Sequence, residues 1–101
     1  MKAVEVRYRV RPEYVEQNKA NVRRVMEALR ARPIEGMLYS TYTIDHGSTF
    51  VHINIARDAE TLGRLSEVAE FREFQAALKE SKPMEPPVAS ELNLVAASFA
   101  L

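Results

Sequence analysis

Polar and apolar residues alternate over residues 3–11. The apolar face carries Val4, Val6, Tyr8 and Val10, and the opposite face carries Glu5, Arg7, Arg9 and Arg11. A period of two is that of a half-buried β-strand. The pattern therefore predicts a first strand that ends at Pro12, with the arginines facing solvent or a partner chain.

Residues 13–31 change to a helical period. Apolar and amide side chains recur at Tyr14, Asn18, Val22, Val25, Met26 and Leu29. Pro12 suits the first turn of a helix, whereas Pro33 and Gly36 do not continue one. We therefore expect one amphipathic helix between the first strand and residue 33.

Residues 37–56 form the strongest local pattern in the chain. Two segments rich in β-branched and aromatic residues, 37–44 and 48–56, flank a short connector that contains Asp45, His46 and Gly47. Such segments favour strands, and a short connector with a glycine makes them antiparallel neighbours. We predict a β-hairpin here.

The last part of the chain predicts a second helix and a final strand. Asp58 is a typical N-cap, and apolar residues continue at helical spacing to about residue 81, with a kink or break expected around residues 69–74. Three prolines indicate a loop over residues 82–87, because proline disrupts strand pairing. Residues 90–100 are apolar on both faces, which predicts a strand covered on both sides.

The predicted order is β-α-β-β-α-β in a single domain over residues 1–101. It is the ferredoxin-like α+β arrangement, an antiparallel sheet with two helices on one face. The uncovered face would carry either Val51, Ile53 and Ile55 or Phe50, His52 and Asn54 of the third strand, and the last strand is apolar on either side, so this face would be largely apolar. Apolar patches of this kind usually mark an interface, so we expect a homodimer with sheets packed face to face.

Composition narrows the possible partners. The chain has 14 Lys and Arg against 14 Asp and Glu, so it lacks the basic excess typical of nucleic-acid binders. It has no cysteine, which excludes disulfides and thiolate chemistry. We find no signal-peptide pattern and no apolar run of membrane-spanning length. The expectation is a cytoplasmic protein that binds neither nucleic acid nor membrane.

His52 and Asn54 are the best candidates for chemistry. They share one face of the second hairpin strand, and a histidine can transfer protons while an amide can stabilise an oxyanion. The alternative for both is a structural, hydrogen-bonded role. His46, in the connector, is expected to be a solvated turn residue. Two histidines six residues apart match no zinc spacing, so no metal and no cofactor is predicted.

Five further residues could contact a ligand. Asn18 would either bond the sheet or line a pocket between helix and sheet, and the aromatic residues would either pack the core or line the same pocket. The predicted substrate-binding residues are Tyr8, Asn18, Tyr42, Phe71 and Phe74.

The chain resembles the antibiotic biosynthesis monooxygenase-like family over essentially its whole length. The resemblance is carried by the order of elements, by RDAETLGRL at the start of the second helix, and by FREFQAAL followed by a proline-rich turn and SELNLVAA. It implies a dimeric α+β barrel with an apolar pocket between each sheet and its helices, into which His52 and Asn54 would face. Val51, Ile53 and Ile55 would then line the dimer.

The resemblance also bears on activity. Members include cofactor-independent oxygenases of phenolic or quinol-like substrates and haem-degrading enzymes. His52 and Ala56 stand where some members have a functional Asn and a Trp, and Leu65 stands about where many have a histidine. These differences argue against the haem-degrading branch.

Three functions remain open from the sequence. The first is a small-molecule-binding barrel that acts as a cofactor-free monooxygenase, with His52 as the base and Asn54 as the oxyanion donor. The second is a non-catalytic ligand-binding or stress-related protein with a structural His52. The third is a small isomerase or decarboxylase that uses the same pocket.

Overall fold

The structure, a computed structural model, describes residues 1–45 and 47–101, so the expectation for His46 lies outside the described residues. The elements follow the predicted order. They are β1 (Lys2–Arg9), a 3-10 turn η1 (Pro12–Tyr14), α1 (Val15–Ala31), β2 (Met37–Ile44), β3 (Thr49–Ala56), α2 (Ala59–Gly63), a 3-10 turn η2 (Arg64–Glu67), α3 (Ala69–Glu80) and β4 (Glu85–Leu92).

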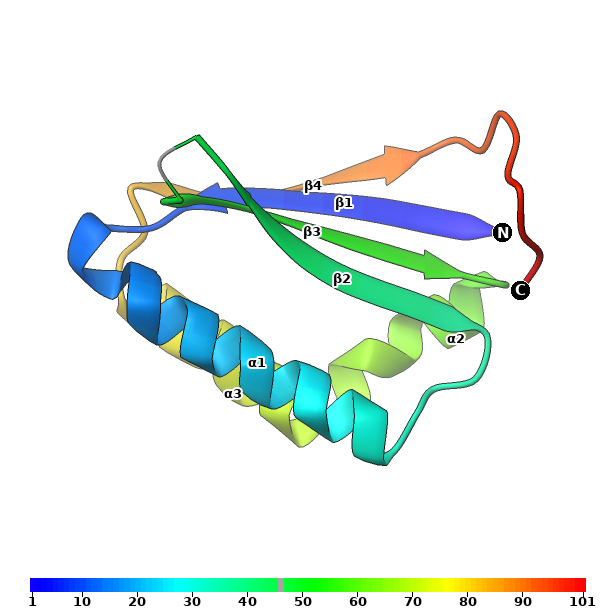
Figure 1. The fold of residues 1–101 in the computed structure, drawn as a ribbon, viewed down its shortest axis with the longest axis horizontal. Helices are drawn as coiled ribbons and strands as arrows, with labels where there is room; N and C mark the ends of the chain where they lie inside the picture. Colours follow the sequence, from blue (N-terminus) through cyan, green and yellow to red (C-terminus); the bar gives the residue numbers. More distant parts are fainter. Residues whose placement is uncertain (46) are drawn as a thin grey trace.

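The strands form one antiparallel sheet in the order β2-β3-β1-β4. Helices α1 and α3 lie side by side under one face of this sheet, and α2 lies below one end of it (Figure 1). No described helix covers the opposite face, which we call the open face. The α+β, ferredoxin-like architecture predicted from the sequence is confirmed.

The strand register decides which residues face the helices. Val6 of β1 and Thr41 of β2 both pair with His52 of β3, so even-numbered residues of β1 and β3 share a face with odd-numbered residues of β2. This face packs on the helices through a buried cluster made of Tyr8, Val10, Val22, Val25, Phe50, Phe74 and Leu78.

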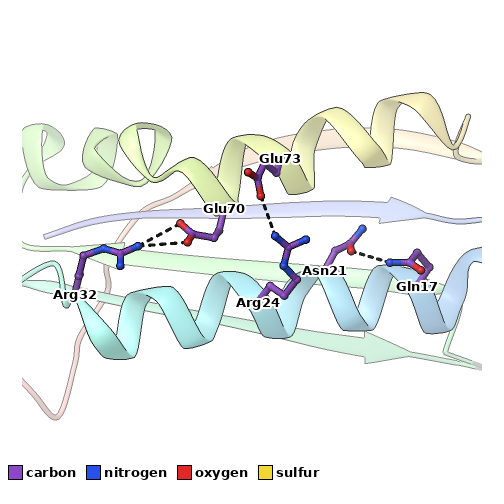
Figure 2. Close-up of polar contacts among 6 residues, drawn as sticks. All are labelled: Gln17, Asn21, Arg24, Arg32, Glu70 and Glu73. Carbon is purple, nitrogen blue, oxygen red and sulfur yellow. Dashed lines mark hydrogen bonds and ion pairs between the residues drawn. The ribbon is translucent and has the colours of Figure 1, made fainter.

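Ion pairs link the two long helices on their outer side. The Arg24 guanidinium lies 3.1 Å from the Glu73 carboxylate, and that of Arg32 lies 3.4 Å from the Glu70 carboxylate (Figure 2). These side chains are mostly exposed, and exposed pairs contribute about 0–1 kcal/mol each. The buried cluster, rather than these bridges, holds α1 and α3 together.

The second helical segment begins as predicted and divides slightly earlier than expected. The Asp58 carboxylate accepts a hydrogen bond of 2.8 Å from the Thr61 backbone N–H, which confirms it as an N-cap. The helix then breaks at Val68, whose ψ of 121° is extended, one residue before the stretch where a break was predicted. Residues 59–67 and α3 therefore run in different directions beneath the sheet (Figure 1).

The prediction for the last strand is wrong in its position. Strand β4 begins at Glu85 and includes Pro86 and Pro87, which were expected to lie in a loop. Proline is tolerated here because β4 is an edge strand and because its register against β1 shifts between Arg7 and Arg9, where the prolines lie.

The prediction that this strand is covered on both sides is also wrong for the single chain. Every residue of β4 is exposed, and residues 93–101 are exposed and not in a strand. An edge strand has one neighbour, and here no described residue packs on its open face. Among the described residues, no helix is long and apolar enough to cross a membrane.

Candidate functional site

A cavity of about 720 Å³ lies between the helix-facing side of the sheet and the second helical segment. Strands β1 and β3 form its roof, and α2, η2 and α3 form its floor. Most of its surface is apolar, contributed by residues that include Val4, Val6, Leu62, Leu65, Phe71, Phe74 and Leu78. His52 lies in the roof and is 5% exposed.

Both ring nitrogens of His52 are engaged by side chains of neighbouring strands. Nδ1 lies 2.6 Å from the Tyr39 hydroxyl and 3.0 Å from Thr41 Oγ1, both on β2. Nε2 lies 2.8 Å from the Tyr8 hydroxyl on β1. Strand β3 therefore presents a histidine that side chains of β1 and β2, on either side of it, hold in place.

The network continues to helix α1. Asn18 Nδ2 donates a hydrogen bond of 2.8 Å to the Tyr8 hydroxyl oxygen, which leaves the Tyr8 proton free to donate to His52 Nε2. We therefore assign the His52 proton to Nδ1, which donates to Tyr39. The other tautomer would bring two donors to the Tyr8 oxygen and leave the hydroxyl proton without an acceptor in this network.

Burial keeps these groups uncharged at neutral pH. It lowers the pKa of His52 to about 4, and it raises the pKa of Tyr8 and the pKa of Tyr39 well above the usual range of a phenol. Desolvation disfavours the charged form of each group. The roof of the cavity is thus polar and hydrogen-bonded, but neutral.

Aromatic rings surround the histidine on the helix side. The His52 and Phe74 ring centroids are 5.3 Å apart, and Phe71 meets Tyr39 edge to face at 6.1 Å. Such contacts orient rings as well as bury them. The hydroxyl of Tyr39 and the ring of His52 are therefore fixed by packing and by hydrogen bonds together.

Asn54 lies in the same roof, two residues beyond His52. Its Oδ1 is shielded from solvent, yet it has no hydrogen-bond partner among the described residues. Buried amide oxygens are normally paired. Asn54 therefore differs from His52, whose two ring nitrogens are both hydrogen-bonded to other side chains of the protein.

The structure brings together most of the residues singled out in the sequence. His52, Asn54, Tyr8, Phe71 and Phe74 all line the cavity, in the orientation that the family resemblance implies. Whether they bind or transform a ligand stays a prediction.

Two of the predicted substrate-binding residues lie elsewhere. Asn18 is fully buried on α1 and bonds Tyr8 from behind, outside the cavity wall. Tyr42 pairs with Val51, so it is on the open face, where it is 54% exposed. It borders a separate, shallower hollow between α1 and β2. The structure does not bring these two residues into the wall of this cavity, and their ligand-binding role stays a prediction.

Tyr39 and Thr41 were missed in the sequence. The signal that could have found them is the hairpin register, since pairing Ile44 with Thr49 places Tyr39 and Thr41 on the same face as His52. Among the described residues, no three His, Asp or Glu side chains are grouped so as to hold a metal ion.

Comparisons with known proteins bear on the fold. No protein-family model and no curated protein matches the chain. Rv0793 from Mycobacterium tuberculosis matches with a TM-score of 0.80 at 18% identity, over 97% of this chain and 98% of that one. PA3566 from Pseudomonas aeruginosa matches with a TM-score of 0.76 at 20% identity, over 94% of each chain.

A solved structure described as an antibiotic biosynthesis monooxygenase also matches. Its TM-score is 0.79 at 17% identity, and the match covers 95% of this chain and all of the other. Identities this low establish the fold alone. The chain therefore has the fold of the antibiotic biosynthesis monooxygenase-like proteins, which confirms the sequence resemblance at the level of architecture.

Proposed function

We propose that this protein binds a small, neutral, largely aromatic molecule in the cavity between its sheet and its second helical segment. The observation that carries the proposal is an apolar cavity whose buried titratable groups, His52, Tyr8 and Tyr39, are all uncharged at neutral pH. Its volume of about 720 Å³ lies within the range of small-molecule sites, roughly 300–1,000 Å³.

The lining argues for a neutral ligand. A charged group would lose its hydration on entering, and the buried wall offers no charge to compensate. Lys79 is the one charged residue in the wall, and it is exposed. Rings of Phe71 and Phe74 and the aliphatic side chains of α2 favour an aromatic ligand through contact area and ring packing.

A second candidate function is cofactor-independent monooxygenation of such a ligand. It is favoured by the shared fold with a protein described as an antibiotic biosynthesis monooxygenase. In this reaction one oxygen atom of O₂ enters the substrate, and the other leaves as water with two hydrogens that the same substrate molecule gives up. His52 Nε2, reached through the Tyr8 hydroxyl, would accept the first proton, although the low pKa of His52 makes it a weak base.

We further propose that two copies of the chain pair through the open face. Large apolar side chains are exposed on it, including Val88 at 63%, Tyr42 at 54% and Leu38 at 49%. The register places all three on the side away from the helices. Patches of this kind are costly in water and usually mark an interface, and two-fold pairing covers the same patch on both copies.

Ligand binding can be tested with 1-naphthol by isothermal titration calorimetry. We expect one site per chain in the wild-type protein. Leu62→Trp adds a ring to the cavity wall and should weaken binding at least about tenfold by filling the space, whereas Ala76→Trp, at an exposed position of α3, should leave affinity unchanged. Equal binding by the two variants would place the ligand outside this cavity.

Oxygenation can be tested by oxygen uptake with a panel of hydroquinones and polyphenols. If the second candidate is right, His52→Ala should keep the fold and lower turnover by about 10²–10⁴-fold, the usual contribution of a positioned base. His52→Gln should be nearly as inactive, because an amide cannot take the proton. No uptake by the wild-type protein with any substrate would leave ligand binding as the function.

The oligomeric state tests the pairing of open faces. Light scattering at micromolar concentration should give about twice the chain mass of 11.5 kDa. Val88→Glu should produce a folded monomer, because the position is exposed in one chain but would bury an unpaired charge in a dimer. Ala76→Glu, on exposed α3, is the control and should remain dimeric. A monomeric wild-type protein would contradict the proposal.

Stability should depend on pH through His52. The folded pKa of about 4 lies below the ordinary histidine pKa of 6.5, so between these values the unfolded chain binds a proton that the folded chain does not. The contribution is complete above pH 6.5 and falls by about 3 kcal/mol as pH drops toward 4. Denaturant unfolding at a series of pH values should show this loss in the wild-type protein. A slope in His52→Gln equal to that of the wild type would contradict a buried neutral histidine.

A further inference from the structure

Asn54 is the polar side chain of the cavity that the fold leaves unused. Tyr8, Tyr39 and His52 bond one another in the roof, but Asn54 Oδ1 has no partner among the described residues and is shielded from solvent. A buried amide without a partner costs stability. The cavity therefore contains one recognition group that only a bound molecule or ordered water can complete.

A second buried amide oxygen without a partner among the described residues has a different explanation. Asn18 also has an unpartnered Oδ1, but its Nδ2 bonds Tyr8 and its side chain lies outside the cavity wall. Asn18 thus contributes to the buried hydrogen-bond network through its side-chain N–H donor. Asn54 makes no such bond, so a structural role does not account for its amide.

The register places Asn54 at one end of the cavity. It pairs with Val4 of β1, close to α2 and η2, whereas Pro86 and Pro87 lie at the shifted register opposite Tyr8. Four residues along β1 separate these positions, or about 13 Å. The cavity is therefore an elongated space with a carboxamide near one end and proline rings near the other.

We propose that Asn54 selects the ligand by pairing its carboxamide with an adjacent donor and acceptor on a neutral aromatic ring system. A lactam or cyclic amide has this chemistry, with N–H and C=O side by side. The pairing group would lie at the α2 end, and the ring would extend toward Pro86 and Pro87. This inference rests on the proposed function, because it names the chemistry that the same cavity recognises.

The test compares two ligands that differ in one donor. 2-Quinolinone carries the adjacent N–H and C=O, and 1-methyl-2-quinolinone lacks the donor. In calorimetry we expect the wild-type protein to bind 2-quinolinone at least about tenfold more tightly, because the methylated ligand leaves the Asn54 oxygen unpaired.

Substitutions test whether Asn54 is the residue that discriminates between the two ligands. Asn54→Leu has nearly the same shape and should reduce the ratio of the two affinities to about one while it still binds the methylated ligand. Its melting temperature should hold or rise, since an unpaired amide is removed. Gln17→Leu is the control, because Gln17 is an exposed amide on α1 outside the cavity wall, and the ratio should be unchanged. If Asn54→Leu does not fold, Asn54→Val, better suited to a strand, gives the same comparison.

The outcomes separate this inference from the proposed function. A wild-type ratio of one, or a preference that survives in Asn54→Leu, would overturn the role of Asn54 while binding in the cavity stands. Failure of the wild-type protein to bind 2-quinolinone, its methylated form and 1-naphthol alike would overturn both.

Discussion

Both ring nitrogens of His52 are hydrogen-bonded to side chains of the strands on either side, and the interior of the protein depends on this arrangement. Tyr39 and Thr41 hold Nδ1 from β2, and Tyr8 holds Nε2 from β1. The antiparallel register places each partner on the helix-facing side of the sheet. A slip of one residue in either strand pairing would therefore turn that strand's partner side chains to the open face. The network thus ties the pairing of the three strands to the shape of the cavity.

Burial of the same residues decides the electrostatics of the cavity. Because desolvation disfavours the charged form of each group, the imidazole stays neutral and the phenols beside it stay protonated. A neutral wall suits a neutral aromatic ligand better than an ion. It also makes His52 better suited to orienting Tyr39 than to removing protons, which is why binding is our first proposal and oxygenation the second.

Local patterns in the sequence were enough to predict most of the fold. The period-two strand, the helical period after it and the hairpin all depend on neighbouring residues, and His52 and Asn54 share a face by alternation alone. Tyr39, Thr41 and Tyr42 were not assigned correctly, because their faces depend on a register that a single residue in the turn can change.

The last strand was misplaced for a related reason. Pro86 and Pro87 would interrupt a central strand, but β4 is an edge strand with a register shift beside them. Whether a strand lies at the centre or at the edge of the sheet is decided only when the sheet assembles. The local sequence pattern therefore could not show that these prolines would be tolerated. The missing partner of Asn54 is likewise visible only when every neighbour in the cavity is placed.

The protonation state of His52 tests the central claim most directly. Long-range ¹H–¹⁵N NMR of the His46→Gln variant, which leaves a single histidine, reports the tautomer and charge of the ring at each pH. We expect a neutral ring with its proton on Nδ1 from pH 8 down to pH 5, and protonation only near pH 4 or below. A ring that titrates near 6.5, or one that carries its proton on Nε2, would contradict the hydrogen-bonded network described for this cavity.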